Sequence, residues 1–180
     1  LLGEKPSGDE TRSLLGKPTP CVGRDRELAV LDLLFSECRD DATARVALIL
    51  APAGMGKSRL RHELSRRLQS RHEPVTVLMC RADPLSSALP YSLLQQAVRQ
   101  MCGISDGEST TAQQHKLLAH AQTRLLQEDA IRVAEFLAEL CGVPVSDAEN
   151  VRLRAARDDA RIMGDQIHRA FIELLRSECA

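Results

Sequence analysis

Residues 45–58 read RVALILAPAGMGKS, and this stretch carries the strongest signal for the fold. Residues 46–50 form a continuous apolar run of strand length, which is typical of a parallel strand covered on both faces. A loop with two glycines follows directly. After the loop, Leu60, Leu64 and Leu68 recur every four residues, which predicts an amphipathic helix that begins at about Lys57. The stretch therefore predicts a buried strand, a glycine-rich loop and a helix in direct succession.

The pattern outward from this stretch predicts an α/β fold that is rich in helix. Residues 75–80 are a second apolar run, so strand, loop, helix and strand would make one parallel crossover unit. Beyond it the spacing of apolar residues predicts helices, and residues 1–20 hold three prolines and three glycines without periodicity. We expect a linker at 1–20 and one domain over 21–180, with two parallel strands. The expected helices cover 24–38, 57–69, 91–102, 113–127, 130–141 and 159–179, with a less regular one at 150–157.

The loop from Ala51 to Ser58 matches the Walker A pattern, [A/G]-x-x-x-x-G-K-[S/T], of phosphate-binding loops. Glycines at 54 and 56 allow the backbone to turn its N–H groups toward a phosphate. Lys57 would place its ammonium on the β- and γ-phosphates as the catalytic lysine, and Ser58 would give its hydroxyl to Mg²⁺. The alternative is an ordinary turn with a surface lysine, which the joint spacing disfavours. The predicted cofactors are ATP and Mg²⁺, held by Ala51, Pro52, Ala53, Gly54, Met55, Gly56, Lys57 and Ser58.

Other charged and sulfur-bearing residues give weaker signals. Arg59 and Arg61 follow the loop and could contact phosphate, or could lie on a solvated helix face. The six cysteines occur singly, never as C-x-x-C, which favours free thiols in a reducing cytoplasm over disulfides or zinc. His115 and His120 lack partners at metal-ligand spacing, so we expect surface residues.

Composition excludes several kinds of partner. The 24 Lys and Arg residues are interleaved with 25 Asp and Glu residues, and only 2% of the chain is aromatic, so we expect no direct nucleic-acid binding. No run approaches the roughly 18 apolar residues that span a bilayer, and the start is too polar for a secretory signal. We therefore expect a soluble, cytoplasmic protein without a membrane partner.

A second motif precedes the loop and carries a resemblance. Residues 22–28 read VGRDREL, and residues 51–60 read APAGMGKSRL. This pairing resembles the AAA-like P-loop ATPase module of the STAND class, signal-transduction ATPases with numerous domains. The likeness runs from about Pro18 to the chain end, and the lead-in resembles the segment that follows a bacterial serine/threonine kinase or cyclase domain. It implies a three-layer P-loop NTPase fold, with Val22, Gly23 and Arg24 near adenine or ribose. The alternative for VGR is a plain helix start.

The resemblance also implies a part that the sequence lacks. Hydrolysis in such modules needs a Walker B strand, an apolar run that ends in acidic residues, and residues 1–180 contain none. In similar sequences it follows shortly after a helix like the one at 159–179, so we expect a module truncated before it. Family topology then implies that residues 46–50 and 77–80 do not pair directly.

Three functions follow from these signals. The leading hypothesis is an ATP-dependent regulatory switch in a multidomain signalling protein, with ATP or ADP and other domains of the same polypeptide as partners. One alternative is a nucleotide-binding scaffold without hydrolysis, and whether this chain acts as an enzyme stays open. A small-molecule P-loop kinase is disfavoured because the sequence shows no arginine-rich lid.

Overall fold

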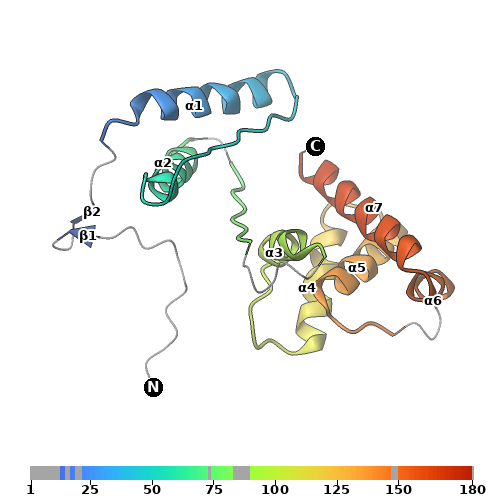
Figure 1. The fold of residues 1–180 in the computed structure, drawn as a ribbon. Helices are drawn as coiled ribbons and strands as arrows, with labels where there is room; N and C mark the ends of the chain where they lie inside the picture. Colours follow the sequence, from blue (N-terminus) through green and yellow to red (C-terminus); the bar gives the residue numbers. More distant parts are fainter. Residues whose placement is uncertain are drawn as a thin grey trace. The chain divides into compact units, whose positions relative to one another are not determined.

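The computed structural model describes residues 13–14, 17–18, 22–72, 74–82, 90–146 and 150–179. In these residues the chain forms seven helices and one pair of two-residue strands (Figure 1). It divides into two compact units, Leu1–Val77 and Leu78–Ala180, and each is described here by itself.

The predicted α/β fold with two parallel strands is wrong for the described residues. The two strands found there are β1 (Ser13–Leu14) and β2 (Lys17–Pro18), which pair antiparallel within the predicted linker, with Ser13 opposite Pro18. The remainder of residues 1–20 lies outside the described part. The described chain is therefore helical, and the predicted three-layer arrangement around a parallel sheet is not found.

Within the described residues, neither apolar run that was predicted as a strand has a neighbouring strand. Residues 43–50 are extended and exposed, and Val46, Leu48 and Leu50 are 93%, 79% and 81% exposed. An apolar run forms a buried strand only when a second strand supplies the matching hydrogen bonds and another layer covers its side chains. In the described residues neither condition is met, so the run stays extended without forming sheet.

The second run, residues 75–80, is held by glutamine side chains. The Gln100 amide donates to Met79 O (2.6 Å) and accepts from Met79 N (2.9 Å). The Gln96 amide makes the same pair of bonds with Arg81, at 2.9 Å and 2.8 Å. Because residues two apart point their backbone groups to the same edge of an extended chain, these two amides take the place of a neighbouring strand there.

The first unit contains α1 (Asp25–Asp40) and α2 (Lys57–Gln69). Leu28 and Leu60 are the buried apolar residues of its described part. Both lie on the faces that the leucine spacing predicted. The loop that precedes α2 therefore belongs to a unit in which two helices share a small apolar core.

The second unit packs five helices around α5 (Gln127–Cys141). The others are α3 (Ser92–Met101), α4 (Thr110–Gln122), α6 (Val151–Asp158) and α7 (Ala160–Glu178). Helices α3, α4 and α7 pack against α5, and α6 packs on α7. Phe136, Leu137 and Val133 of α5 are at most 1% exposed, so α5 supplies the centre of this core.

Capping residues set several helix starts that periodicity placed less accurately. Helix α4 begins at Thr110, three residues before the predicted start, because Ser109 accepts a bond from Ala112 N. Asn150 and Asp159 cap α6 and α7 in the same way. The predicted helix at 159–179 is confirmed almost to its ends.

Candidate functional site

The loop at 51–58 has the backbone conformation that its glycines were predicted to allow. Gly54 and Gly56 adopt φ angles of +82° and +80°. This left-handed region disfavours residues with a Cβ atom, so both positions call for glycine. Pro52, Ala53, Met55 and Ser58 are exposed, and Ala51 and Lys57 are half-buried. The loop is therefore an exposed turn whose shape depends on two glycines.

Helix α2 begins directly at this turn, with Gly56 as its N-cap. No side chain caps its first amides, and its first turn holds no acidic residue. By contrast, Asp25 and Glu27 occupy the first turn of α1, the helix beside it. The uncapped N–H groups and the helix dipole leave partial positive charge at the start of α2, which suits an anion.

Lys57 folds back over the loop. Its ammonium donates to Ala51 O at 2.6 Å and to Pro52 O at 2.8 Å. These contacts tie Lys57 to the first two residues of the motif and close the turn between them. An ammonium has three donors, so Lys57 also has the capacity to bond an oxygen of a ligand.

The other predicted contacts of the loop are less direct. Ser58, the predicted Mg²⁺ ligand, is exposed beside Lys57. Arg59 has its Nε and Nη1 buried without a hydrogen-bond partner in the described residues. The Arg59 side chain is therefore partly buried, and the predicted contact with phosphate stays a prediction.

Arg24 connects the VGR segment to the loop. Its Nη2 donates to Met55 O at 2.8 Å, and its Nη1 donates to Glu27 Oε1 at 2.6 Å. The bond from Arg24 lowers the pKa of the Glu27 carboxyl. Val22 is 81% exposed, and Gly23 has a φ of +73°. Of the three VGR residues, the structure shows a contact with the loop for Arg24.

A groove of about 660 Å³ opens beside the loop. Val30, Leu31 and Leu34 of α1 line one side, and the extended residues 47–51 line another. The turn itself closes the end, because Met55, Gly56, Lys57 and Leu60 complete the lining. The groove joins an apolar surface to the positive start of α2, and its volume is typical of small-molecule sites.

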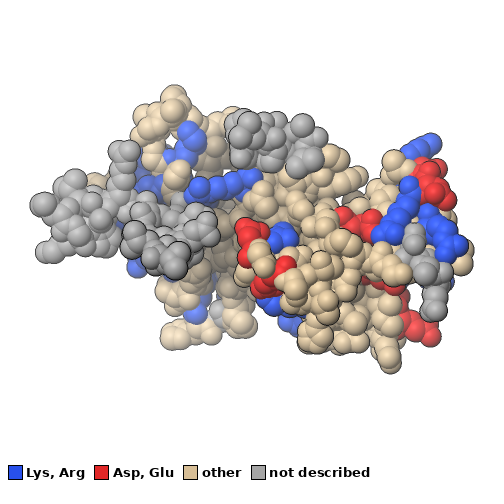
Figure 2. Space-filling model, turned by 90° about the horizontal axis from the view of Figure 1, so that it is seen from below, with Lys and Arg blue, Asp and Glu red and all other residues tan. Residues whose placement is uncertain are grey.

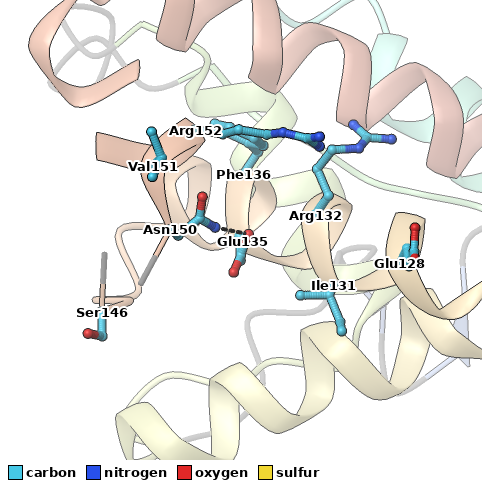
Figure 3. A pocket seen from close by; sticks show the side chains of 9 residues that line it. All are labelled: Glu128, Ile131, Arg132, Glu135, Phe136, Ser146, Asn150, Val151 and Arg152. Atoms are coloured by element: carbon cyan, nitrogen blue, oxygen red, sulfur yellow. Dashed lines mark hydrogen bonds between the residues drawn. The ribbon is translucent and has the colours of Figure 1, made fainter. Parts of the chain in front are cut away.

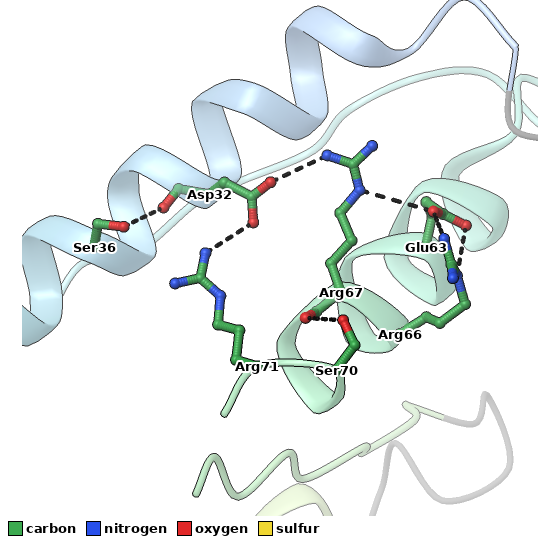
Figure 4. Close-up of polar contacts among 7 residues, drawn as sticks. All are labelled: Asp32, Ser36, Glu63, Arg66, Arg67, Ser70 and Arg71. Atoms are coloured by element: carbon green, nitrogen blue, oxygen red, sulfur yellow. Dashed lines mark hydrogen bonds and ion pairs between the residues drawn. The ribbon is translucent and has the colours of Figure 1, made fainter. Parts of the chain in front are cut away.

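Sequence reasoning missed an ionic cluster that joins α1 to α2. Asp32 of α1 accepts bonds from Arg67 and Arg71 (Figure 4). The available signal was the spacing in the sequence, because Asp32 lies four residues, about one helical turn, after the buried Leu28. Glu63 of α2 is also buried, and a bond from Arg66 lowers its pKa. Asp32, Arg67 and Arg71 do not line the groove, but their bonds connect the two helices that do.

A second hollow, of about 710 Å³, lies in the helical unit, beside α5 and α6. Figure 3 shows the Asn150 amide directed at Glu135, to which it donates at 2.5 Å. Arg132 in the same hollow is already paired with Asp129 and Glu173. Its lining holds two acids, Glu128 and Glu135, beside two bases, Arg132 and Arg152, so it lacks the positive character that a polyphosphate needs.

Metal-binding clusters are not found among the described residues, because no three or more His, Cys, Asp or Glu side chains gather there. Five cysteines of that part, Cys38, Cys80, Cys102, Cys141 and Cys179, are free thiols, as predicted, and Cys21 lies outside it. Of the helices described, none combines the length and apolar character of a membrane span. On the face drawn in Figure 2, basic and acidic side chains lie next to one another, in keeping with the interleaved charges of the sequence.

Comparison with known proteins relates the chain to a family model and to a curated relative. The family model of the AAA ATPase domain matches residues 20–180. An uncharacterized protein of Rhizobium meliloti (strain 1021) is 26% identical over 181 residues, which covers 99% of this chain. The chain spans 16% of the length of that relative. No solved structure matches the chain.

Proposed function

This chain belongs to the AAA ATPase domain family, and we propose that it binds Mg-ATP at the loop formed by residues 51–58. Lys57 would contact the β- and γ-phosphates, and the hydroxyl of Ser58 would be a ligand of Mg²⁺. The nucleoside would lie in the groove between α1 and the extended residues 47–51. The preference for ATP over GTP is part of this proposal. The choice of Mg²⁺ as the metal is also part of it.

One observation carries the proposal: a lysine at the uncapped start of α2, after two glycines at positive φ. The same turn borders a groove large enough for a nucleotide. Phosphate groups are held in proteins by converging N–H donors and a cation, and this turn offers both. The hollow beside Glu135 offers no lysine, and the start of α5, which reaches it, carries the acidic residues Glu128 and Asp129 in its first turn.

The contacts of Lys57 suggest how the loop would exchange partners. In the structure its ammonium bonds to the carbonyl groups of Ala51 and Pro52. Phosphate oxygens are stronger acceptors for an ammonium than neutral carbonyl groups are. We expect Lys57 to turn from the carbonyl groups to the phosphates when the nucleotide binds.

A regulatory role within a larger signalling protein is the finer part of the proposal. It is supported by the resemblance of VGRDREL and APAGMGKSRL to STAND modules. The relative in Rhizobium meliloti also contains much more polypeptide than the part it shares with this chain. A serine/threonine kinase or cyclase as the neighbouring domain, and a cytoplasmic location, remain predictions.

A nucleotide-binding scaffold without hydrolysis is the second candidate. Residues 1–180 contain the phosphate-binding loop but no apolar run that ends in the acidic residues that position Mg²⁺ and water, so binding without turnover is considered beside hydrolysis. Release of inorganic phosphate from Mg-ATP by the purified chain separates the two. Turnover that disappears with Lys57→Ala would support an ATPase, and tight binding without turnover would support the scaffold.

Calorimetric titration of the chain with Mg-ATP tests the binding itself. We expect Lys57→Ala to weaken binding about tenfold or more, which is about 1.4 kcal/mol or more. Lys116→Ala is a matched control, because it removes one positive charge from the helical unit, where Lys116 bonds to Glu108. Equal heats for wild type and Lys57→Ala would refute the assignment of the loop. Repeating the titration in EDTA tests the role of Mg²⁺.

A further inference from the structure

Apolar packing between α1 and α2 is limited, so polar contacts carry much of their association. Leu28 and Leu60 are the buried apolar side chains of the described part of this unit. A core of this size buries few side chains, each of which contributes about 1.5–3 kcal/mol. Further leucines of both helices, such as Leu31 and Leu64, are only partly buried, so the ionic contacts between the helices add to a limited apolar packing.

Asp32 is the centre of those contacts (Figure 4). Its Oδ2 accepts from Arg67 Nη1 at 3.2 Å, and its Oδ1 accepts from Arg71 Nη2 at 3.2 Å. Both carboxylate oxygens are thus engaged by arginines that come from α2 and from the turn just after it. The Asp32 side chain is 26% exposed, which shields these contacts partly from solvent.

The second arginine of this cluster makes a further contact with α1. The guanidinium carbon of Arg71 lies 4.6 Å from the centre of the Phe35 ring, within the range of a cation–π interaction. Arg67 also lies near Glu63, with 3.7 Å between Nε and Oε1. Asp32 therefore holds two arginines that are in turn fixed by a ring on α1 and an acid on α2.

The same two helices form opposite parts of the nucleotide groove. Val30, Leu31 and Leu34 of α1 lie on either side of Asp32 in the chain and line the groove, whereas Asp32 does not line it. Gly56 and Lys57, at the start of α2, line its other end. The width of the groove therefore follows from the distance at which α1 is held from α2.

We propose that Asp32 is a positioning residue for nucleotide binding, which holds α1 against α2 so that the groove accepts the base and ribose. It rests on the function proposed above. The phosphates would be bound by the loop, whose glycines and lysine do not contact Asp32. Loss of Asp32 would then weaken the contacts of the nucleoside and leave those of the phosphates intact.

Two ligands separate this role from a general structural one. Mg-ATP needs both the loop and the groove, whereas inorganic tripolyphosphate with Mg²⁺ needs the loop alone. A side chain that merely supports the fold would affect both ligands to the same degree. The ratio of the two affinities therefore reports on the groove.

The experiment is a calorimetric titration of the full chain, wild type and variants, with each of the two ligands. We expect Asp32→Asn to weaken Mg-ATP binding about tenfold and tripolyphosphate binding by less than about twofold. Asp32→Glu keeps the carboxylate and should restore most of the affinity for Mg-ATP. Asp40→Asn, also on α1 and bonded in the structure to its neighbour Arg39, is the matched control and should change neither.

Each result that differs from these expectations contradicts one part of the proposal. If wild type binds both ligands and Asp32→Asn retains its affinity for Mg-ATP, the positioning role is wrong while nucleotide binding stands. An equal loss for both ligands in Asp32→Asn and in the milder Asp32→Glu would show a structural role instead. Wild type that binds Mg-ATP but no tripolyphosphate would contradict the division between loop and groove. Wild type that binds neither ligand would refute the proposed function as well.

Discussion

Replacement of Gly56 by alanine tests the conformation on which the candidate site depends. Gly56 has a φ of +80° and is the N-cap of α2. A Cβ atom added there would meet no heavy atom within 4 Å. The cost of Gly56→Ala therefore comes from the left-handed backbone alone, which disfavours a residue with a Cβ by about 1–2 kcal/mol.

Hydrogen exchange measures this cost where it arises. A loss of about 1–2 kcal/mol in local stability should speed exchange of the first hydrogen-bonded amide of α2, Leu60 N–H, which donates to Gly56 O, by about 5- to 30-fold. Gly56→Asn is the control, because asparagine tolerates both the left-handed region and the N-cap position, and it should have a smaller effect. Exchange in α7 should be unchanged in both variants.

Binding of Mg-ATP by the same variants extends the test to the ligand. A phosphate seated in the turn would approach the added Cβ, so the affinity of Gly56→Ala should fall by more than the change in exchange. The reasoning is refuted if Gly56→Ala exchanges at the wild-type rate, because the strain would then be absent. Equal effects of alanine and asparagine would also contradict it.

Three further predictions concern the helical unit. Burial raises the pKa of the Glu135 carboxyl above the ordinary value of 4.5. The protonated carboxyl therefore contributes most to the free energy of unfolding below pH 4.5, and this contribution declines as the pH rises through the raised pKa. Glu135→Gln should remove that decline in thermal unfolding curves followed by circular dichroism. Phe136→Ala should lower the free energy of unfolding in urea by about 3–5 kcal/mol, because this side chain is 1% exposed. Leu126→Ala, at a site that is 82% exposed, should change it by no more than about 0.5 kcal/mol. Burial raises the pKa of the Cys102 thiol to about 12, so iodoacetamide at mildly alkaline pH should label exposed Cys179 first, as read by mass spectrometry.

Local pattern was sufficient for the helices and for the loop. Leucines four residues apart predicted α2, and Gly54, Gly56 and Lys57 predicted the turn at its start, where the structure has positive φ angles. These features depend on residues close together in the chain, so their physics can be read from the sequence. Helix starts were less accurate where a cap such as Ser109 adds a turn ahead of the first apolar residue.

The sequence did not predict correctly the strands or the contacts between distant residues. Residues 46–50 have the composition of a buried strand, yet a strand needs a partner, and in the described residues that run has none. Met79 and Arg81, at and just after the end of the second run, instead bond to the side-chain amides of Gln100 and Gln96, an arrangement that apolar periodicity does not encode. Asp32 was overlooked for the same reason, because its arginine partners lie 35 and 39 residues away.

The sequence by itself determined the helices, the glycine-rich turn at residues 51–58 and membership of the AAA ATPase domain family. Only the tertiary structure decided that Arg24 reaches Met55 O, that Lys57 bonds to the carbonyl groups of the loop, and that α1 forms a side of the groove. The physical reason is range. Backbone preferences and helical periodicity act within a few residues, whereas hydrogen bonds, ion pairs and burial depend on which distant segments meet in space.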